Sequence, residues 1–198
     1  MVFRMYARWV AVAPFSSQVV VASTTTALAD YVVQKTSKPE EKPNISRIAG
    51  FGLFGAVYLG VAQHVMYVNL FSRLFGRETL EAFGAMSLRD KLNDRSGLIN
   101  VGKQLVLDFL VVQPVIFWPA YYSTRALVDT QSVAKIPEYL GTYKKNFVED
   151  NVGMCAFWLP ADTIIYSLPL RWRLHASHLV QFGFSTLMSI FRGETEEE

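Results

Sequence analysis

The stretch Gly52-Leu53-Phe54-Gly55-Ala56-Val57-Tyr58-Leu59-Gly60 lies inside the longest uncharged run of the chain, which extends from Ile48 to Ser72. Its small residues Gly52, Ala56 and Gly60 recur every four positions, so on a helix they form one narrow stripe. In lipid, such a stripe lets a second helix approach closely, because association there depends on packing. Since about 20 apolar residues cross a bilayer, the run predicts a membrane-spanning helix packed against a neighbour. The alternative is a buried helix of a soluble protein.

The composition favours the membrane. The chain has 198 residues, of which 51% are apolar and 18% are charged, whereas soluble domains average about 25% charged residues. The net charge is +2, but four glutamates lie in an acidic tail at residues 193–198. Without these four, 19 basic and 13 acidic residues remain, an excess that suits anionic lipids such as cardiolipin. Basic residues do not cluster with interleaved aromatics, which argues against nucleic-acid binding.

The hydropathy pattern predicts an all-α fold, a polytopic membrane protein with about four transmembrane helices in one domain over residues 1–198. The membrane-embedded regions are expected at residues 14–35, 46–75, 98–127 and 152–191. Short amphipathic helices are expected at the interface within residues 78–90 and outside the membrane at residues 137–150. Proline predicts kinks at Pro114, Pro119 and Pro160. Arg171-Trp172-Arg173 is typical of an interfacial anchor.

An ionisable residue at membrane depth is a functional-site hypothesis, and Asp108 is the strongest case. Sixteen uncharged residues follow it, and Gln104, one turn earlier, is expected to form a hydrogen bond with it. Two interpretations stay open: a pathway-lining carboxylate, and a carboxylate that ties helices together. His64 and Tyr67 share a helix face and are candidates for the same two roles.

No catalytic pattern stands out: there is no phosphate-binding glycine loop and no nucleophile motif. His175, His178 and Gln181 form a stripe, but a metal site needs further ligands, so no metal or cofactor is predicted. Cys155 is the only cysteine, which excludes an intrachain disulfide. Asp162 follows Pro160 by two residues and is expected to cap a half-helix after a break.

Several short motifs occur in a particular order along the chain. These are Asp30 with Gln34, the run from Gly60 to Leu70, Asp108 with Pro114, Trp158 with Pro160, Pro169 with Arg173, and the run from Phe184 to Ser189. In this order the chain resembles the Mpv-seventeen and 22-kilodalton peroxisomal membrane protein family over residues 29–189. It differs from the family pattern at Val61, Met66, Phe109 and Phe184.

The resemblance implies a small organellar membrane protein with weakly selective channel activity involved in membrane homeostasis. The alternative is a structural accessory subunit of a large mitochondrial inner-membrane complex, such as a respiratory-chain complex or the ATP synthase. Expected partners are membrane lipids and either a homo-oligomer or subunits of that complex. Arg4 and Arg8 precede the first acidic residue, Asp30, which favours the mitochondrial inner membrane over the peroxisomal membrane.

Overall fold

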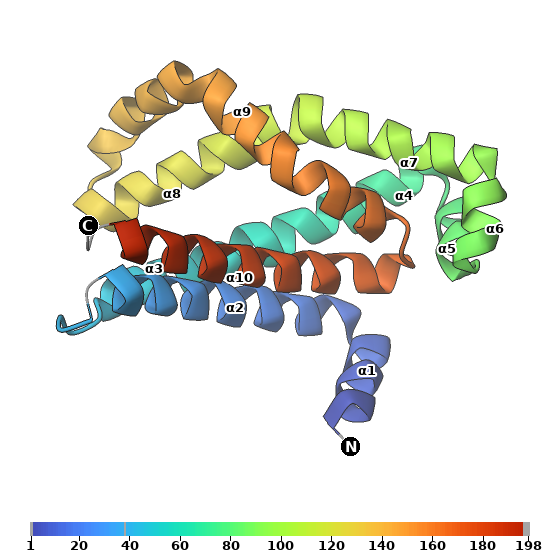
Figure 1. The fold of residues 1–198 in the computed structure, drawn as a ribbon, viewed down its shortest axis with the longest axis horizontal. Coiled ribbons are helices and arrows are strands. Elements are labelled where there is room, and N and C mark those ends of the chain that lie inside the picture. The colour runs from blue at the N-terminus through green and yellow to red at the C-terminus, as the bar shows by residue number, and fades with distance from the viewer. Residues whose placement is uncertain (1, 38, 196–198) are drawn as a thin grey trace. The chain divides into compact units, whose positions relative to one another are not determined.

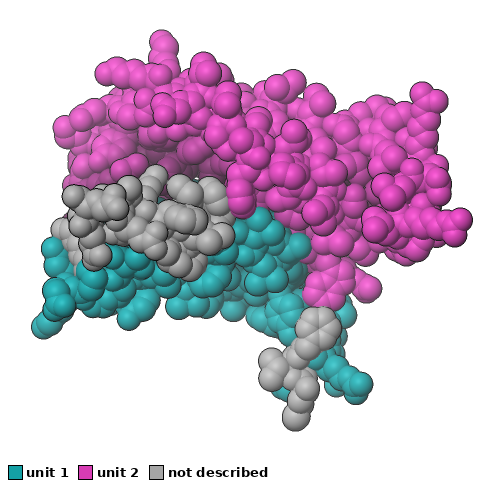
Figure 2. Space-filling model, viewed as in Figure 1, with its two compact units in different colours: residues 1–65, 174–198 teal, residues 66–173 magenta. Residues whose placement is uncertain are grey.

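The computed structural model describes residues 2–37 and 39–195, with side chains for residues 4–37 and 39–183. Every regular element in these ranges is helical (Figure 1), so the predicted all-α class is confirmed. The end of the acidic tail and the side chains of the Phe184–Ser189 motif lie outside the described residues. By their internal contacts the residues group into two compact units, residues 1–65 with 174–198 and residues 66–173 (Figure 2).

Unit 1 is built on an antiparallel helical hairpin. A short helix α1 (Val2–Val12) precedes α2 (Pro14–Ser37), and α3 (Ile45–Phe54) returns alongside α2 and continues into the π-helix η1 (Gly55–Ala62) (Figure 1). The last helix, α10 (Leu170–Thr195), joins this unit from Leu174 onward.

Glycines set the spacing between the two arms of the hairpin. A Cβ atom added to Gly55 would lie 2.6 Å from the carbonyl oxygen of Ala22, and one on Gly60 would lie 2.9 Å from the Cα of Val19. Gly52 also faces α2, where its carbonyl oxygen accepts a 2.9 Å hydrogen bond from the Ser23 hydroxyl. The close helix approach that the small residues predict therefore occurs between two helices of this same chain, and Gly55 takes part in it.

Polar side chains close the loop end of this hairpin. Asp30 forms an ion pair with Arg47 at 3.0 Å and accepts a hydrogen bond from Gln34 at 2.6 Å. The Gln34 side chain also accepts from the backbone N–H of Asn44, which is the N-cap of α3. Asp30 and Gln34, which belong to the family-like motif, thus fasten the end of α2 to the start of α3.

Unit 2 contains the remaining helices. From Met66 the π-helix η2 (His64–Leu70) leads into α4 (Phe71–Phe75), and Gly76, with a φ of 80°, turns the chain into α5 (Arg77–Ala85). Then come α6 (Leu88–Asn93), α7 (Arg95–Leu107), the π-helix η3 (Asp108–Phe117), α8 (Trp118–Thr130), the 3-10 turn η4 (Val133–Lys135) and α9 (Ile136–Tyr166).

Pro114, Pro119 and Pro160 all lie inside continuous helical segments. Residues 95–130 form one continuous helical segment, and the π-helix η3 contains Pro114. A π turn shifts the hydrogen-bonding partners by one residue, as in the bond from the Trp118 N–H to the Gln113 carbonyl. The missing N–H of Pro114 therefore falls where the α-helical ladder has already changed register.

The fourth predicted region, 152–191, covers parts of two helices and does not begin with a helix of its own. The amphipathic segment at residues 137–150 and the start of region 152–191 form one helix, α9, which runs through Pro160. The prediction that Asp162 caps a half-helix was wrong, because the helix is unbroken from Ile136 to Tyr166. The break comes at residues 167–169, directly before α10.

Two helical segments are long and apolar enough to cross a membrane, Ile45–Phe75 and Arg95–Thr130. These coincide with the predicted regions 46–75 and 98–127. Among the described residues no other helix meets this measure, so regions 14–35 and 152–191 do not. Length and composition alone are weak evidence, since a buried helix of a soluble protein meets the same measure.

Candidate functional site: the Asp108 cluster

Asp108 lies in the interior of unit 2 with only 1% of its surface exposed. Its Oδ1 atom accepts a hydrogen bond from the Tyr67 hydroxyl at 2.7 Å, and its Oδ2 atom accepts one from the Tyr166 hydroxyl at 2.6 Å. Tyr67 and Tyr166 are buried as well. Hydrogen bonds of this length to a carboxylate are among the stronger ones in proteins. Both oxygens of the carboxylate therefore have a fixed partner from another helix.

Arg173 is the second centre of this site, and it too is 1% exposed. Its Nη1 atom donates to the Gln104 side-chain oxygen at 2.7 Å, its Nη2 to the Tyr166 carbonyl at 2.6 Å, and its Nε to the Leu168 carbonyl at 2.9 Å. A guanidinium presents its donors in a rigid planar fork, which suits three acceptors around one point. The prediction of an interfacial anchor at this residue was wrong, because the side chain is buried.

Gln104 has a different partner from the one expected. It is fully buried, accepts from Arg173, and donates to the Asn100 carbonyl at 3.1 Å. We call Tyr67, Gln104, Asp108, Tyr166 and Arg173 the Asp108 cluster. Its members come from η2, α7, η3, α9 and the first turn of α10, so the cluster joins five helical segments of unit 2.

The local sequence explains how Tyr166 and Arg173 come together. Tyr166 ends α9, and Pro169 follows in the short break before α10, where its ring suits the start of a new helix. A Cβ atom on Gly84 would lie 2.6 Å from the nitrogen of Pro169, so a glycine in α5 lets the break pack closely. The guanidinium of Arg173 then reaches back to the carbonyls of Tyr166 and Leu168.

Asp162 lies one helical turn before Tyr166 and is 5% exposed. Among the described residues it has neither a hydrogen bond nor an ion pair. A buried carboxyl group without partners costs stability. We therefore expect Asp162→Asn to leave the melting temperature of the purified protein unchanged or to raise it, because the substitution removes an ionisable group that no neighbour stabilises.

The matched variant is Asp108→Asn, which leaves one carboxamide NH2 facing a tyrosine hydroxyl. It is expected to lower the stability by about 1–3 kcal/mol. Thermal unfolding of both variants in the same detergent checks the pair. A larger loss for Asp162→Asn than for Asp108→Asn would contradict this account.

His64 and Tyr67 do not share a site, although they share a helix face in the sequence. Tyr67 belongs to the Asp108 cluster in unit 2, whereas His64 Nδ1 lies 2.7 Å from the Gln18 side-chain oxygen in unit 1. Gln18 also donates to the Gly60 carbonyl at 3.0 Å. This second polar group connects α2 with η1 and η2 and was not foreseen, because Gln18 sits in a segment rich in serine and threonine.

The histidines of the last helix take structural positions in unit 1. His175 Nε2 lies 3.2 Å from the Ser17 hydroxyl, and the His175 ring packs edge-on against Tyr6. His178 is buried. The described residues contain no group of three or more histidine, cysteine, aspartate or glutamate side chains placed to hold a metal ion.

The remaining residues of the family-like motifs are distributed over unit 2. The Pro114 carbonyl accepts a 2.7 Å hydrogen bond from Tyr143, and this bond connects η3 with α9. Trp158 is buried in the same helix as Pro160. These positions therefore serve helix packing, like Pro169 in the break before α10.

Tyr166 is the member of the cluster that the sequence did not indicate. A tyrosine near the end of an apolar segment is typical of a membrane interface. Nothing in the sequence around Tyr166 therefore indicated that it contacts Asp108. Arg173 was singled out only as part of a motif and an anchor.

Comparison of the chain with models of known families, with curated proteins and with solved structures returned no match.

Proposed function

We propose that the chain is a multi-pass protein of the mitochondrial inner membrane, resembling the Mpv-seventeen family, that acts as a structural accessory subunit of a large membrane complex. The membrane location is supported by the two long apolar segments. Only 33% and 28% of their most apolar windows are buried inside the protein. A core helix of a soluble protein would be mostly buried, so most of this apolar surface requires lipid or a protein partner.

The main support for the structural role is that the hydrogen-bonding groups of Asp108 and Arg173 in the Asp108 cluster already have partners. Both oxygens of Asp108 accept from tyrosines, and three nitrogens of Arg173 donate to oxygens of the same unit. A group that lines a conduction path must exchange its partners with ions or water. These groups instead hold helices together, which favours a scaffold that presents apolar faces to its surroundings.

The location in mitochondria is supported by the first helix. In α1, Arg4 and Arg8 are one turn apart and Arg4 is exposed, and no acidic residue precedes Asp30. A basic helix free of acidic residues is typical of mitochondrial targeting. The peroxisomal membrane is the alternative location.

The decisive experiment is a native gel of mild-detergent extracts from the organelle membrane, probed for this chain. Migration with a large assembly is expected. Migration only as a monomer or a small homo-oligomer would contradict the accessory role and leave the membrane location intact. Extraction by alkaline carbonate would contradict the membrane location itself.

A weakly selective channel is the second candidate, because one specific observation favours it: an ionisable residue, Asp108, lies in an apolar segment of spanning length. The two functions differ in their response to Asp108→Asn. Conductance of the purified protein in planar bilayers should depend on this residue if the channel exists. If the protein is a scaffold, the wild-type chain should show no conductance above the empty bilayer.

A further inference from the structure

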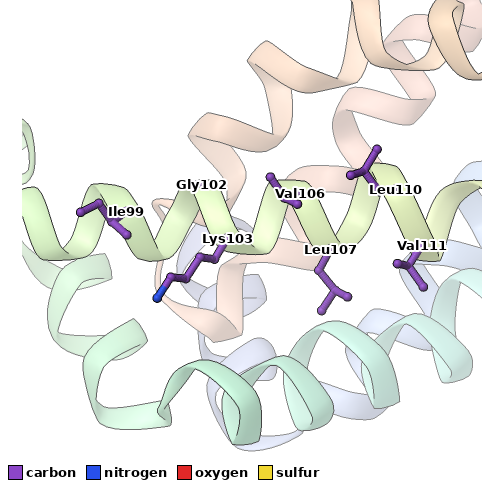
Figure 3. A pocket seen from close by; sticks show the side chains of 7 residues that line it. All are labelled: Ile99, Gly102, Lys103, Val106, Leu107, Leu110 and Val111. Carbon is purple, nitrogen blue, oxygen red and sulfur yellow. The ribbon is translucent and has the colours of Figure 1, made fainter.

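An open groove runs along the outer surface of α7 and the start of η3, with a volume of about 510 Å³. It is lined by Lys103 and six apolar residues between Ile99 and Val111 (Figure 3). All of them belong to unit 2, and none belongs to the Asp108 cluster. The groove lies on the segment Arg95–Thr130, one of the two that are long and apolar enough to span a membrane.

Helical geometry explains the shape of the groove. Gly102, Val106 and Leu110 form one row at intervals of four residues, and Lys103, Leu107 and Val111 form the adjacent row. Figure 3 shows the side chains of the two rows pointing to opposite sides of the ribbon. The space between two such rows is a groove parallel to them, and its apolar walls suit a hydrocarbon chain.

Gly102 opens the groove at the end where Lys103 lies. A Cβ atom added to Gly102 would meet nothing within 4 Å. Glycine is unfavourable inside a helix compared with alanine, and no neighbouring backbone at this position requires it. The missing side chain leaves room beside the lysine.

Lys103 supplies a positive charge at this opening. It is exposed, and among the described residues its ammonium group has neither a hydrogen bond nor an ion pair. The closest acidic residue along the same helical segment, Asp108, is buried and already accepts from two tyrosines. An unpaired cation beside an apolar groove is complementary to an anionic head group attached to an acyl chain.

We propose that this groove binds an anionic phospholipid of the bilayer, with the lipid phosphate against the Lys103 ammonium and an acyl chain between the rows that end at Leu110 and Val111. The inference rests on the proposed membrane location. The sequence order agrees with it, because Lys103 precedes the sixteen uncharged residues 109–124 and so lies near the level at which head groups begin.

The test is native mass spectrometry of the purified full-length chain in mild detergent. Dioleoyl phosphatidylglycerol and dioleoyl phosphatidylcholine are added separately, so that the two probes differ only in the head group. The wild-type protein should retain more of the anionic lipid. Lys103→Gln should lower that retention about fivefold, since one lysine near an anionic surface contributes about that factor. Lys145→Gln, at another exposed lysine, should not change it.

Gly102→Leu tests the groove separately from the charge. The leucine side chain has free space to occupy, so the protein should fold and should lose both lipids. Equal retention of the two lipids by the wild type, or unchanged phosphatidylglycerol retention by Lys103→Gln, would overturn the proposal. Alkaline carbonate extraction of the native membrane distinguishes the two failures, because a chain that stays in the pellet but shows no lipid preference refutes only the lipid site.

Discussion

Replacing Arg173 by leucine is expected to lower the stability of the protein by about 3–5 kcal/mol in total, because three oxygens lose their hydrogen-bond donor. The substitution leaves the side-chain oxygen of Gln104 and the backbone carbonyls of Tyr166 and Leu168 without the donor that now binds them. Buried acceptors without a partner cost about 1–3 kcal/mol each. Thermal unfolding in detergent, followed by tryptophan fluorescence, measures the loss.

Two further variants make this result specific. Arg173→Lys keeps the charge but not the planar fork, so it should recover only part of the stability. Arg89→Leu removes an exposed arginine of α6 and should change the stability by no more than about 0.5 kcal/mol. Similar melting temperatures for Arg173→Leu and Arg89→Leu would show that the buried contacts of Arg173 carry no net stability.

The second large effect is expected at Gly55. Alanine there would place its Cβ atom 2.6 Å from the Ala22 carbonyl oxygen and 2.7 Å from the Thr26 Oγ1 atom. One of these neighbours is backbone of α2, so the two arms of the hairpin must move apart. Overpacking of this kind typically costs about 1–3 kcal/mol, and here it acts against helix propensity, which favours alanine.

Gly153→Ala is the matched control for Gly55→Ala. Gly153 lies within α9, and a Cβ atom on it would meet nothing within 4 Å. The same chemical change should therefore stabilise the protein there by about 0.5–1 kcal/mol. Opposite signs for the two variants in thermal unfolding are the expected result, and a gain at both positions would refute the close approach of α2 and η1.

The long apolar regions were the part of the fold that the sequence predicted best. The apolar regions predicted at 46–75 and 98–127 correspond to the segments Ile45–Phe75 and Arg95–Thr130. An apolar helix of that length can be recognised from the composition and spacing of its own residues alone. The boundary predicted near Asn151, between the amphipathic helix 137–150 and the region 152–191, is absent because α9 continues through it. A change from polar to apolar residues changes what surrounds a helix but does not have to end it.

The partners inside the Asp108 cluster were not predictable from spacing. Asp108 and Gln104 are one turn apart, which made a bond between them plausible, yet Asp108 binds Tyr67 and Tyr166, which lie 41 and 58 residues away in the sequence. Such pairs depend on which helices become neighbours. In the same way, the stripe of Gly52, Ala56 and Gly60 left out Gly55. Gly55 lies three residues after Gly52 and shares its helix face, and an added Cβ atom there would come closer to α2 than one on Gly52 or Gly60.

The composition of unit 1 has a consequence for the biosynthesis of the protein. The hairpin of α2 and α3 joins segments close in sequence and can form early, while the contact between Ser17 and His175 spans 158 residues. Unit 1 therefore cannot be completed until α10 has been made, which is after all of residues 66–173. Until then the surface of α2 that receives His175 is open to chaperones and to wrong neighbours, so the docking of α10 completes the folding of unit 1.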